Sequence, residues 1–559
     1  MSLFSLEYLG FAGILLLLYY LLPRLAGAIA PHAAESSRNS SISQDLSPAA
    51  TSDASPAVAA ASARLQWRIL LIGSLIFYAL NGPGNLIFIL FTALSVFLGS
   101  LQMERITMSF REAKKDSSVT RDQRKILKAQ ALRKKRMILT LVLVLNFGIL
   151  AWLKYWNELF HASSGLLLPL GISFYTFQSL SYLIDIYNDK VPAERSFARF
   201  LLFVSWFPQL LQGPINRYDR IQALYEPHAF DLHRTGRALW LILFGLMKKY
   251  AVADMLVTHI ASLLDVPLED VPGSVIVFAI LLYSAQQYAD FSGGIDIVLG
   301  VSLLFGIPMM ENFKRPYFST SLGDFWRRWH ISLGAWMRDY LFYPFALLKP
   351  MQRFGHWCTK HLGRHFGRVL PAAVSNIVVF FVVGLWHGAA WHYILWGMYN
   401  GVVIALSDLT APFWNCLSQR LHLKTESRGF HVFRIVRTFI IVNIGWYFDR
   451  ITDRQAVGLA FRNTLLRFHA GRLLPQLHGM LLGNGDSLAN VGGSFLIAAI
   501  GIVIIFVVSF RQECGIDVTE RILHATLPVQ TLLAFCLILL VLASFLFTQT
   551  AGGFLYANF

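Results

Sequence analysis

The sequence predicts an all-α polytopic membrane protein with about 11 to 13 transmembrane or re-entrant helices. Of the 559 residues, 55% are hydrophobic and only 14% are charged, against roughly 25% in an average soluble domain. Apolar runs of about 17 to 25 residues, long enough to cross a bilayer core, recur along almost the whole chain. Lys and Arg gather between those runs, a pattern typical of cytoplasmic loops that face anionic lipid headgroups.

The N-terminal region predicts one membrane span followed by a linker. Residues 1–29 hold an apolar run, and residues 28–30 resemble the small-residue cleavage site of a signal peptide. A signal peptide also has a basic segment before its apolar run, whereas this run is preceded by Glu7 and by no Lys or Arg. We therefore expect an uncleaved span. Residues 30–64, rich in Ala, Ser and Pro, predict a flexible linker, which leaves residues 65–559 as the membrane core.

The distribution of charge predicts the orientation of the chain. Twelve Lys or Arg lie between Arg105 and Arg136, so by the positive-inside rule residues 104–136 form a cytoplasmic loop. Counting back through three spans places the N-terminus outside, in agreement with Glu7 before the first span and Arg24 after it. We expect a multi-pass protein of the inner (cytoplasmic) membrane, in contact with membrane lipid.

The later apolar segments vary in length. Several are shorter than about 18 residues or are interrupted by Gly, Pro or charged residues, and so fall below the usual spanning length. Such segments suit re-entrant helices, which are tolerated only where protein or a water-filled cavity surrounds them. The segments run over residues 137–152, 166–184, 197–211, 238–253, 275–305, 374–386, 391–406, 438–448, 495–510 and 527–547.

The sequence argues against several function classes. The net charge of +16 could suggest nucleic acid, but no recognition motif accompanies it, so we expect no nucleic-acid binding. The four cysteines are scattered and support neither a disulfide framework nor a metal site. The chain has no phosphate-binding loop, no dinucleotide fingerprint and no nucleophile elbow. An ATP-driven pump is therefore not expected, and direct transfer assisted by a histidine base is the simplest enzymatic interpretation.

The most informative stretch is residues 384–392, which places His387 in an apolar, aromatic segment. A titratable side chain there is costly, which favours a functional role. An imidazole with a pKa near roughly 6.5 can accept a proton from a hydroxyl as an acyl group arrives and return it to a leaving thiol. The alternative is a core imidazole bonded to a carbonyl. His392 lies five residues on, roughly 140° around a helix, so we expect it to be structural and expect no zinc site.

A second polar region, residues 288–343, interrupts the hydrophobic pattern with closely spaced aromatic and charged side chains. One interpretation is a pair of amphipathic helices at the membrane interface, with Trp and Tyr at headgroup depth. The other is the wall of a polar cavity that reaches into the membrane. His330 is accordingly either an interfacial histidine or part of that cavity.

Six short motifs, taken together and in this order along the chain, are distinctive: Pro169–Gln178, Phe207–Ile215, Asp290–Gly293, Glu311–Phe313, Phe325–His330 and Gly384–Gly388. Together they resemble the membrane-bound O-acyltransferases, and within that family the bacterial branch with the membrane subunit of alginate O-acetylation and the D-alanyl transfer protein of teichoic acid modification. The resemblance implies helices around a central tunnel, with His387 as the catalytic histidine and His330 as a second polar residue of the same tunnel. It also implies four residues that shape or polarise the tunnel: Asp290, Asn312, Arg328 and Gln178.

The resemblance further implies an activity. We expect an O-acyltransferase that takes an acyl group, acetyl in the simplest case, from acetyl-CoA or another cytoplasmic acyl thioester. The group would pass across the membrane to a hydroxyl of an extracytoplasmic acceptor. No tightly bound cofactor and no metal are implied. The implied partners are an extracytoplasmic esterase-like acetyltransferase and an exported or cell-wall polysaccharide.

Three alternatives stay open from the sequence. The first is D-alanyl transfer to teichoic acid, the other activity of this bacterial branch. The second is a transporter that moves acyl groups or small anions without chemistry, with its histidines as a proton relay. The third is a structural membrane subunit that recruits a soluble transferase.

Overall fold

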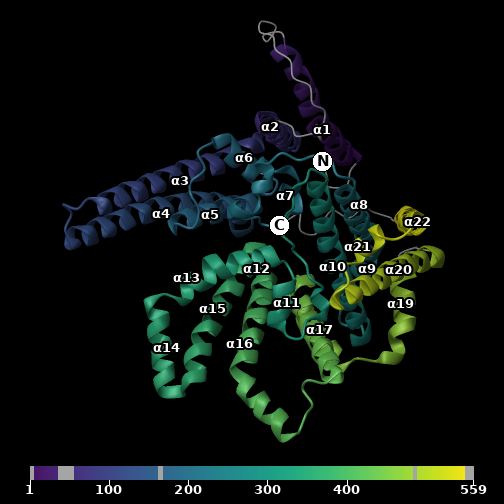
Figure 1. The fold of residues 1–559 in the computed structure, drawn as a ribbon. Coiled ribbons are helices and arrows are strands. Elements are labelled where there is room, and N and C mark those ends of the chain that lie inside the picture. Colours follow the sequence, from purple (N-terminus) through teal and green to yellow (C-terminus); the bar gives the residue numbers. More distant parts are fainter. Residues whose placement is uncertain (1–5, 36–55, 161–167, 483–486, 548–559) are drawn as a thin grey trace. The chain divides into compact units, whose positions relative to one another are not determined.

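A computed structural model describes residues 6–35, 56–160, 168–482 and 487–547. Over these residues the chain is helical and forms no strand, apart from one isolated bridge between Phe313 and Trp329 (Figure 1). Seven described helices are long and apolar enough to cross a membrane. The predicted all-α polytopic membrane class is therefore confirmed.

The described residues contain the α-helices α1 to α22. Their bounds are α1 Leu6–Glu35, α2 Pro56–Leu80, α3 Leu86–Lys115, α4 Arg121–Phe160, α5 Ile172–Tyr187, α6 Phe197–Ser205, α7 Phe207–Gln212, α8 Leu232–Leu246, α9 Asp254–Leu264, α10 Gly273–Leu304, α11 Leu322–Arg328, α12 Ile331–Met337, α13 Tyr343–Ala346, α14 Lys349–Leu362, α15 Arg364–His387, α16 Trp391–Arg420, α17 Arg428–Arg450, α18 Arg454–Leu466, α19 Leu473–Leu482, α20 Leu488–Glu513, α21 Val518–Leu523 and α22 Leu527–Ser544. The candidate spans lie in α1, α3, α4, α15, α16, α20 and α22.

The chain divides into two compact units. Unit 1 comprises residues 1–152, 167–239 and 298–310, and unit 2 comprises residues 153–166, 240–297 and 311–559. Each unit has its own buried aromatic cluster. In unit 1, Tyr8 packs on Phe77 at 5.8 Å between ring centroids, and Phe207 packs edge-on against Phe305 at 6.0 Å. Unit 2 contains both histidines that the sequence singled out, so its packing determines the geometry of the candidate site.

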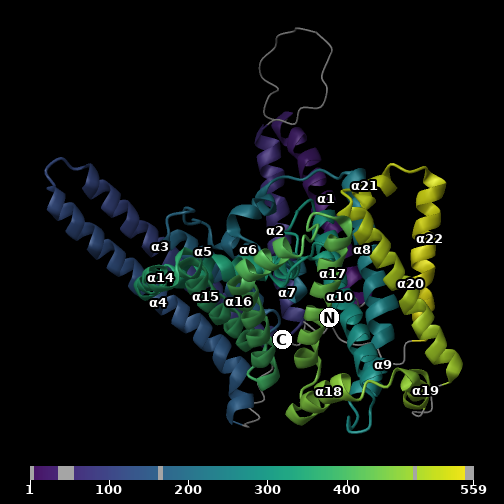
Figure 2. The ribbon, with the colours of Figure 1, turned by 90° about the horizontal axis from the view of Figure 1, so that it is seen from below.

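The basic segment 104–136, expected as a loop, is mostly helical. Helix α3 continues to Lys115 and α4 begins at Arg121, so only five residues connect the two helices, which run side by side in opposite directions (Figure 2). The expectation of a loop was wrong because Lys, Arg, Gln and Leu are strong helix formers, and the helices continue beyond their apolar parts. A reciprocal cap starts α4: Gln123 N–H donates to Thr120 Oγ1 at 3.3 Å, and Thr120 N–H donates to Gln123 Oε1 at 2.9 Å.

The predicted linker is partly helical at both of its ends. Helix α1 extends to Glu35 and α2 begins at Pro56, so residues 30–35 and 56–64 belong to helices. Ala-rich sequence has high helix propensity, which the compositional argument for a linker did not weigh. Residues 36–55 lie outside the described part of the chain.

Helices α15 and α16 pack closely through glycines. A Cβ atom at Gly397 would lie 2.3 Å from the carbonyl oxygen of Phe380, and one at Gly384 would lie 2.5 Å from that of Tyr393. Gly397 and Gly401 are four residues apart, the spacing at which small residues let two membrane helices approach. This close approach fixes the C-terminal end of α15, where His387 lies.

The variant Gly397→Ala is expected to lower thermal stability. The added methyl group would push against the Phe380 carbonyl oxygen and separate α15 from α16, at a cost of about 1 to 3 kcal/mol. The measurement is the melting temperature of the protein in detergent. Gly429→Ala in α17 is the matched control, because no atom lies within 4 Å of a Cβ at that position. Equal melting temperatures for the two variants would contradict the tight α15–α16 contact.

Candidate active site

His387 is the last residue of α15, and the chain turns immediately afterwards into α16. The side chain is buried, with 6% of the residue exposed. Aromatic rings surround the imidazole: Trp386 at 4.9 Å, Trp396 edge-on at 5.1 Å and Tyr393 stacked at 5.9 Å between ring centroids. The sequence thus encloses a titratable ring in an apolar aromatic cage built by the ends of two helices.

His330 lies between α11 and α12 and is also buried, with 2% exposure. Its backbone is left-handed, with φ +47° and ψ +53°. A residue other than Gly in this conformation costs on the order of 1 to 3 kcal/mol and persists only where its surroundings enforce it. Asn312 supplies one constraint, because its backbone oxygen accepts a hydrogen bond from the Ile331 N–H at 3.0 Å. Such strain in a buried histidine is typical of functional sites.

The Asn312 side chain determines which nitrogen of His330 carries the proton. Its Oδ1 accepts hydrogen bonds from the Ser332 N–H at 3.0 Å and from the Ser332 hydroxyl at 2.9 Å. The same oxygen lies 3.2 Å from His330 Nδ1, so Nδ1 is the donor in the neutral ring. The lone pair is then on Nε2, which is the form that a general base requires.

Both histidines contact one tryptophan. The Trp386 ring lies 6.4 Å from the His330 ring and 4.9 Å from the His387 ring, centroid to centroid. Trp396 joins the cluster from α16 and contacts Trp326 of α11 at 5.4 Å. The indole N–H of Trp326 donates to Asn400 Oδ1 at 3.0 Å and so ties α11 to α16. The structure therefore places His330 and His387 in the same aromatic cluster.

Two residues at the end of α4 also reach this cluster. Lys154 Nζ donates to the carbonyl oxygen of Trp386 and lies 5.4 Å from the centre of its ring. The Tyr155 hydroxyl donates to the Leu385 carbonyl oxygen at 2.6 Å. The last carbonyls of a helix have no partner within it, and an ammonium group there is favourable. Sequence reasoning missed both residues, although a lysine at the end of an apolar run was a usable signal.

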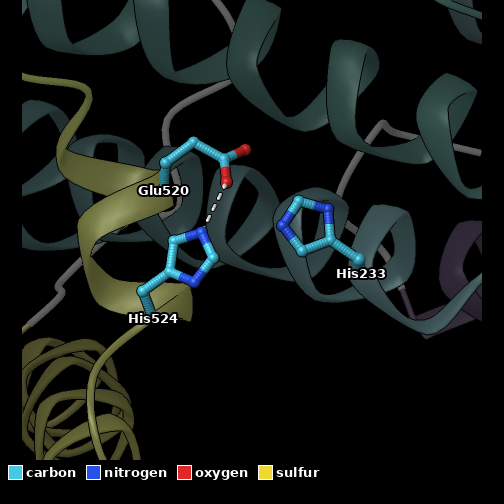
Figure 3. Close-up of side chains that lie close together, drawn as sticks. All are labelled: His233, Glu520 and His524. Carbon is cyan, nitrogen blue, oxygen red and sulfur yellow. Dashed lines mark ion pairs between the residues drawn. The ribbon is translucent and has the colours of Figure 1, made fainter.

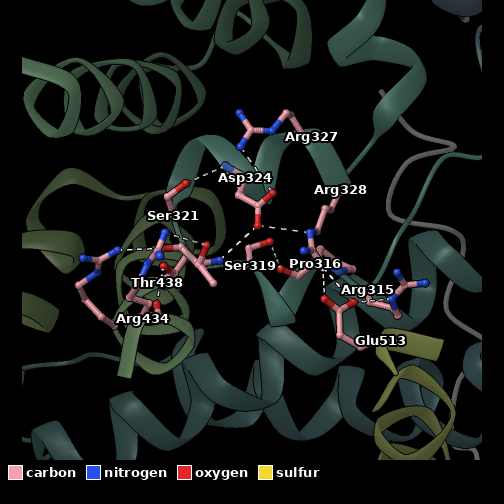
Figure 4. A network of polar contacts seen from close by, with 12 residues as sticks. Arg315, Pro316, Ser319, Ser321, Asp324, Arg327, Arg328, Arg434, Thr438 and Glu513 are labelled. Atoms are coloured by element: carbon pink, nitrogen blue, oxygen red, sulfur yellow. Dashed lines mark hydrogen bonds and ion pairs between the residues drawn. The ribbon is translucent and has the colours of Figure 1, made fainter. Parts of the chain in front are cut away.

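Arg328 is held in an ion-pair network (Figure 4). Its Nη1 lies 3.0 Å from both carboxylate oxygens of Glu513, and its Nε lies 3.3 Å from Asp324 Oδ2. Arg315 Nε lies 2.6 Å from the same Glu513 carboxylate. These contacts fix α11, which ends two residues before His330, to the C-terminal end of α20. A role of Arg328 in a tunnel stays a prediction.

Asp290 and Gln178 occupy separate surroundings. The Asp290 carboxylate lies 2.7 Å from Lys249 Nζ in unit 2. Gln178 belongs to α5 in unit 1, where its Nε2 donates to the Phe203 carbonyl oxygen at 2.8 Å. Of the four residues expected to shape a tunnel, Asn312 contacts a candidate histidine through its side-chain oxygen. The tunnel itself stays a prediction.

His392 is buried in the first turn of α16, with its ring 3.9 Å from that of Tyr393. The Tyr393 ring also contacts His387, so His392 packs against a ring of the cage. Figure 3 shows a different pair, Glu520 of α21 and His524, which directly follows that helix; His524 Nε2 and Glu520 Oε2 are 4.0 Å apart. The His524 side chain is 78% exposed, so this pair is solvated and contributes little to stability. His233, also drawn in Figure 3, belongs to unit 1.

Comparison with known proteins places the site in a family. Residues 189–440 match the membrane-bound O-acyltransferase family. The matched range includes His330, Asn312 and His387 but not Gln178, and it confirms the resemblance seen in the sequence.

The domain has relatives among bacterial acyltransferases. A protein of Pseudomonas syringae pv. tomato named "Probable alginate O-acetylase" is 34% identical over 52% of this chain and 51% of its own length. The peptidoglycan O-acetyltransferase of Helicobacter pylori is 28% identical over 66% of this chain and 69% of its length. The teichoic acid D-alanyltransferase of Bacillus subtilis is 29% identical over 51% of this chain and 70% of its own length. The chain spans about half the length of the alginate relative that it matches.

His330 is expected to make stability depend on pH. The residue lies outside the seven apolar spans, and burial lowers its pKa to about 3. The folded protein holds the ring neutral, whereas the unfolded chain protonates it below about pH 6.5, so stability falls as the pH decreases through that value. From pH 6.5 to 5 the loss is about 2 kcal/mol.

The measurement is the melting temperature at pH 7 and pH 5. His330→Gln keeps a donor for Asn312 but cannot titrate, so its melting temperature is expected to change less between the two pH values than that of the wild type. The surface variant His524→Gln is the control and is expected to behave like the wild type. An identical pH response in His330→Gln and the wild type would show that the folded protein does not exclude the proton from His330.

Proposed function

We propose that this protein is a membrane O-acyltransferase with His387 as its general base and His330 as a companion in the same site. One observation carries the proposal: two buried imidazoles meet on Trp386 within a domain of the O-acyltransferase family. A buried titratable group in an apolar protein is costly, and two such groups in one cluster favour a chemical role. The hydrogen bond of His330 to Asn312 supports the companion role, because it fixes the orientation of the ring and places the proton of the neutral ring on Nδ1.

The proposed reaction is direct transfer from a thioester to a hydroxyl. The acceptor oxygen attacks the thioester carbonyl carbon while His387 takes the hydroxyl proton. The C–S bond then breaks, and the proton passes from the imidazolium to the leaving thiolate, so the enzyme ends unchanged. A positioned base contributes typically 10² to 10⁴-fold to such a step. The reaction requires no electron transfer, and we propose no tightly bound cofactor and no metal.

The donor is proposed to be acetyl-CoA or another acyl thioester that arrives from the cytoplasm. Arg364 and Arg368 lie in the first turns of α15. Arg420 ends α16, and Lys424 and Arg428 follow it, whereas the turn between the two helices at residues 388–390 carries no charge. The positive-inside rule assigns the basic end of this hairpin to the cytoplasm. His387 lies at the opposite end of a 24-residue helix, about 36 Å away. Transfer toward an extracytoplasmic hydroxyl fits this polarity.

The acceptor is proposed to be a hydroxyl of an exported or cell-wall polysaccharide, reached directly or through an extracytoplasmic esterase-like acetyltransferase. The names of the alginate and peptidoglycan relatives support a polysaccharide acceptor. The protein is proposed to lie in the inner membrane with its N-terminus outside. D-alanyl transfer to teichoic acid is the second candidate, supported by the Bacillus relative.

Replacing the proposed base is expected to abolish acyl transfer. Protein reconstituted in lipid vesicles with labelled acetyl-CoA and no ion gradient should transfer label to an acceptor hydroxyl, and His387→Ala should lower that rate by about 10² to 10⁴-fold. His524→Ala is the matched control, because this histidine, directly after α21, is exposed. Full acetylation by His387→Ala at unchanged protein level would disprove the assignment. Label that crosses the membrane while the thioester stays intact would instead identify a transporter.

The identity of the donor is expected to separate the two candidate activities. With acetyl-CoA and a D-alanyl thioester offered at equal concentration, the acetyl group should be transferred preferentially. The measurement is the mass increment on the acceptor. Exclusive transfer of D-alanine would favour the teichoic acid activity. Copurification with a soluble transferase, without thioester cleavage by the membrane protein alone, would favour a recruiting subunit.

A further inference from the structure

Two consecutive lysines follow α8 and are buried against α10. Residues 247–253 form a π-helix between α8 and α9, and it carries Lys248 and Lys249, whose side chains are 5% and 3% exposed. Lys248 Nζ lies 2.7 Å from Asp296 Oδ2, and Lys249 Nζ lies 2.7 Å from Asp290 Oδ1. Both carboxylates belong to α10, so the two lysines hold this helix at two points.

A glycine midway between the two carboxylates permits this contact. Gly293 is three residues from Asp290 and three from Asp296. A Cβ atom at Gly293 would lie 2.9 Å from the carbonyl oxygen of Gly245 and 3.0 Å from Lys248 Cβ. The backbones of α8 and α10 therefore cross at Gly293, and the lysines reach from the crossing to a carboxylate on either side. This arrangement accounts for the stretch Asp290–Asp296, which the general-base mechanism does not use.

Stability alone does not explain charges at this crossing. Burying a charge costs several kcal/mol, and well-packed apolar side chains in place of a buried ion pair are often at least as stabilising. The cluster also holds a third carboxylate, Asp254, whose Oδ1 lies 2.8 Å from Lys249 Nζ. Ion pairs differ from apolar contacts in that they fix one register between two helices. A π-helix interrupting an α-helix is itself frequent at functional sites.

The held part of α10 faces the candidate active site. Phe291 follows Asp290 directly, and its ring packs edge-on against His330 at 4.8 Å and 89°. The Phe291 ring also packs edge-on against Phe313, with 4.9 Å between the ring centroids. Lys248 lies 5.5 Å from the centre of the Tyr288 ring, which packs on Trp329, the neighbour of His330. A change in the register of α10 would therefore move the rings that enclose His330.

We propose that Lys248 and Lys249 are positioning residues for acyl transfer, which act by fixing α10 so that Phe291 orients His330. The inference rests on the proposed function for its effect on rate. Its structural part, the orientation of His330 by the lysines, can be tested without any activity.

The test compares two neutralised variants that keep side-chain volume. The first is Lys249→Met with Asp254→Asn and Asp290→Asn, which removes the cation together with both of its carboxylates. The second is Lys248→Met with Asp296→Asn. Because the Asp296 side chain is 19% exposed, the second variant disturbs the core less and provides the test if the first does not fold. Both avoid leaving a buried charge without its partner, the most destabilising change at such a site.

The matched control removes an ion pair elsewhere in unit 2. Arg450→Met with Asp265→Asn eliminates a pair of 2.7 Å between the ends of α17 and α9, where the Asp265 side chain is 54% exposed. A comparison variant, Asp254→Asn, keeps the Lys249–Asp290 pair and so separates loss of that pair from loss of a nearby charge. For both variants, the rate of acyl transfer and the rate of His330 modification are expected to stay close to those of the wild type.

Two readouts are measured for each variant, at a temperature the same number of degrees below that variant's own melting temperature. The kcat of the neutralised variants should fall by about 10- to 100-fold, with the KM for acetyl-CoA changed by less than about twofold, because misplaced catalytic groups slow the chemical step without weakening donor binding. Peptide mapping after diethylpyrocarbonate treatment should show faster modification of His330 in the same variants. Restoring Lys249 and Asp290 in the triple variant leaves only Asp254→Asn. This should bring both readouts back to their wild-type values.

The outcomes separate the two proposals. Unchanged kcat together with unchanged His330 modification in both neutralised variants would overturn the positioning role. A fall in kcat accompanied by an equal loss in the Arg450 and Asp265 control would also overturn it, since general destabilisation would then account for the effect. If the wild type itself transfers no acyl group, the proposed function fails, and the modification rate of His330 still decides whether the lysines orient it.

Discussion

A polar group inside a membrane-spanning protein has to find its partner within the protein, and this constraint shapes unit 2. Water is not available in the hydrocarbon core, so each unsatisfied group costs several kcal/mol. The carbonyls that end α15 are bound by Lys154 and Tyr155, and the Asn312 amide oxygen is bound by Ser332 and His330. Each partner also fixes a neighbour of an imidazole. For these carbonyl and amide oxygens, the contacts that satisfy the hydrogen bonds are also the contacts that order the site.

Close helix packing makes these contacts possible. Glycines at the α15–α16 contact and at the α8–α10 crossing bring the backbones together, so that short polar side chains and lysine stems can reach across. Aromatic rings then fill the remaining space around His330 and His387. Such a site combines rigid rings with few polar atoms, which suits a reaction that needs one oriented base and little water.

The sequence predicted the all-α membrane class, the resemblance that residues 189–440 bear out, and two histidines that the structure brings into one aromatic cluster, because each signal depends on local pattern. A histidine in an apolar aromatic run is visible within nine residues, and the family motifs are short. Lys154 could not be assigned, since its partner at Trp386 is 232 residues away and is a backbone carbonyl. The role of Asp290 in a tunnel stays a prediction, and its pairing with Lys249 was not predicted because that contact is set by how two helices cross. The charged segment was expected as a loop because composition indicates water exposure and does not distinguish an exposed helix from a loop.

The left-handed backbone of His330 has a consequence for substitutions at this position. Glycine adopts that conformation without strain, so it would relieve the backbone while removing the imidazole. The same change would empty the space that the buried ring fills beside Phe291 and would remove its hydrogen bond to Asn312. The packing of the ring and the strain of its backbone therefore act in opposite directions at this position, and the imidazole persists where its surroundings outweigh the strain.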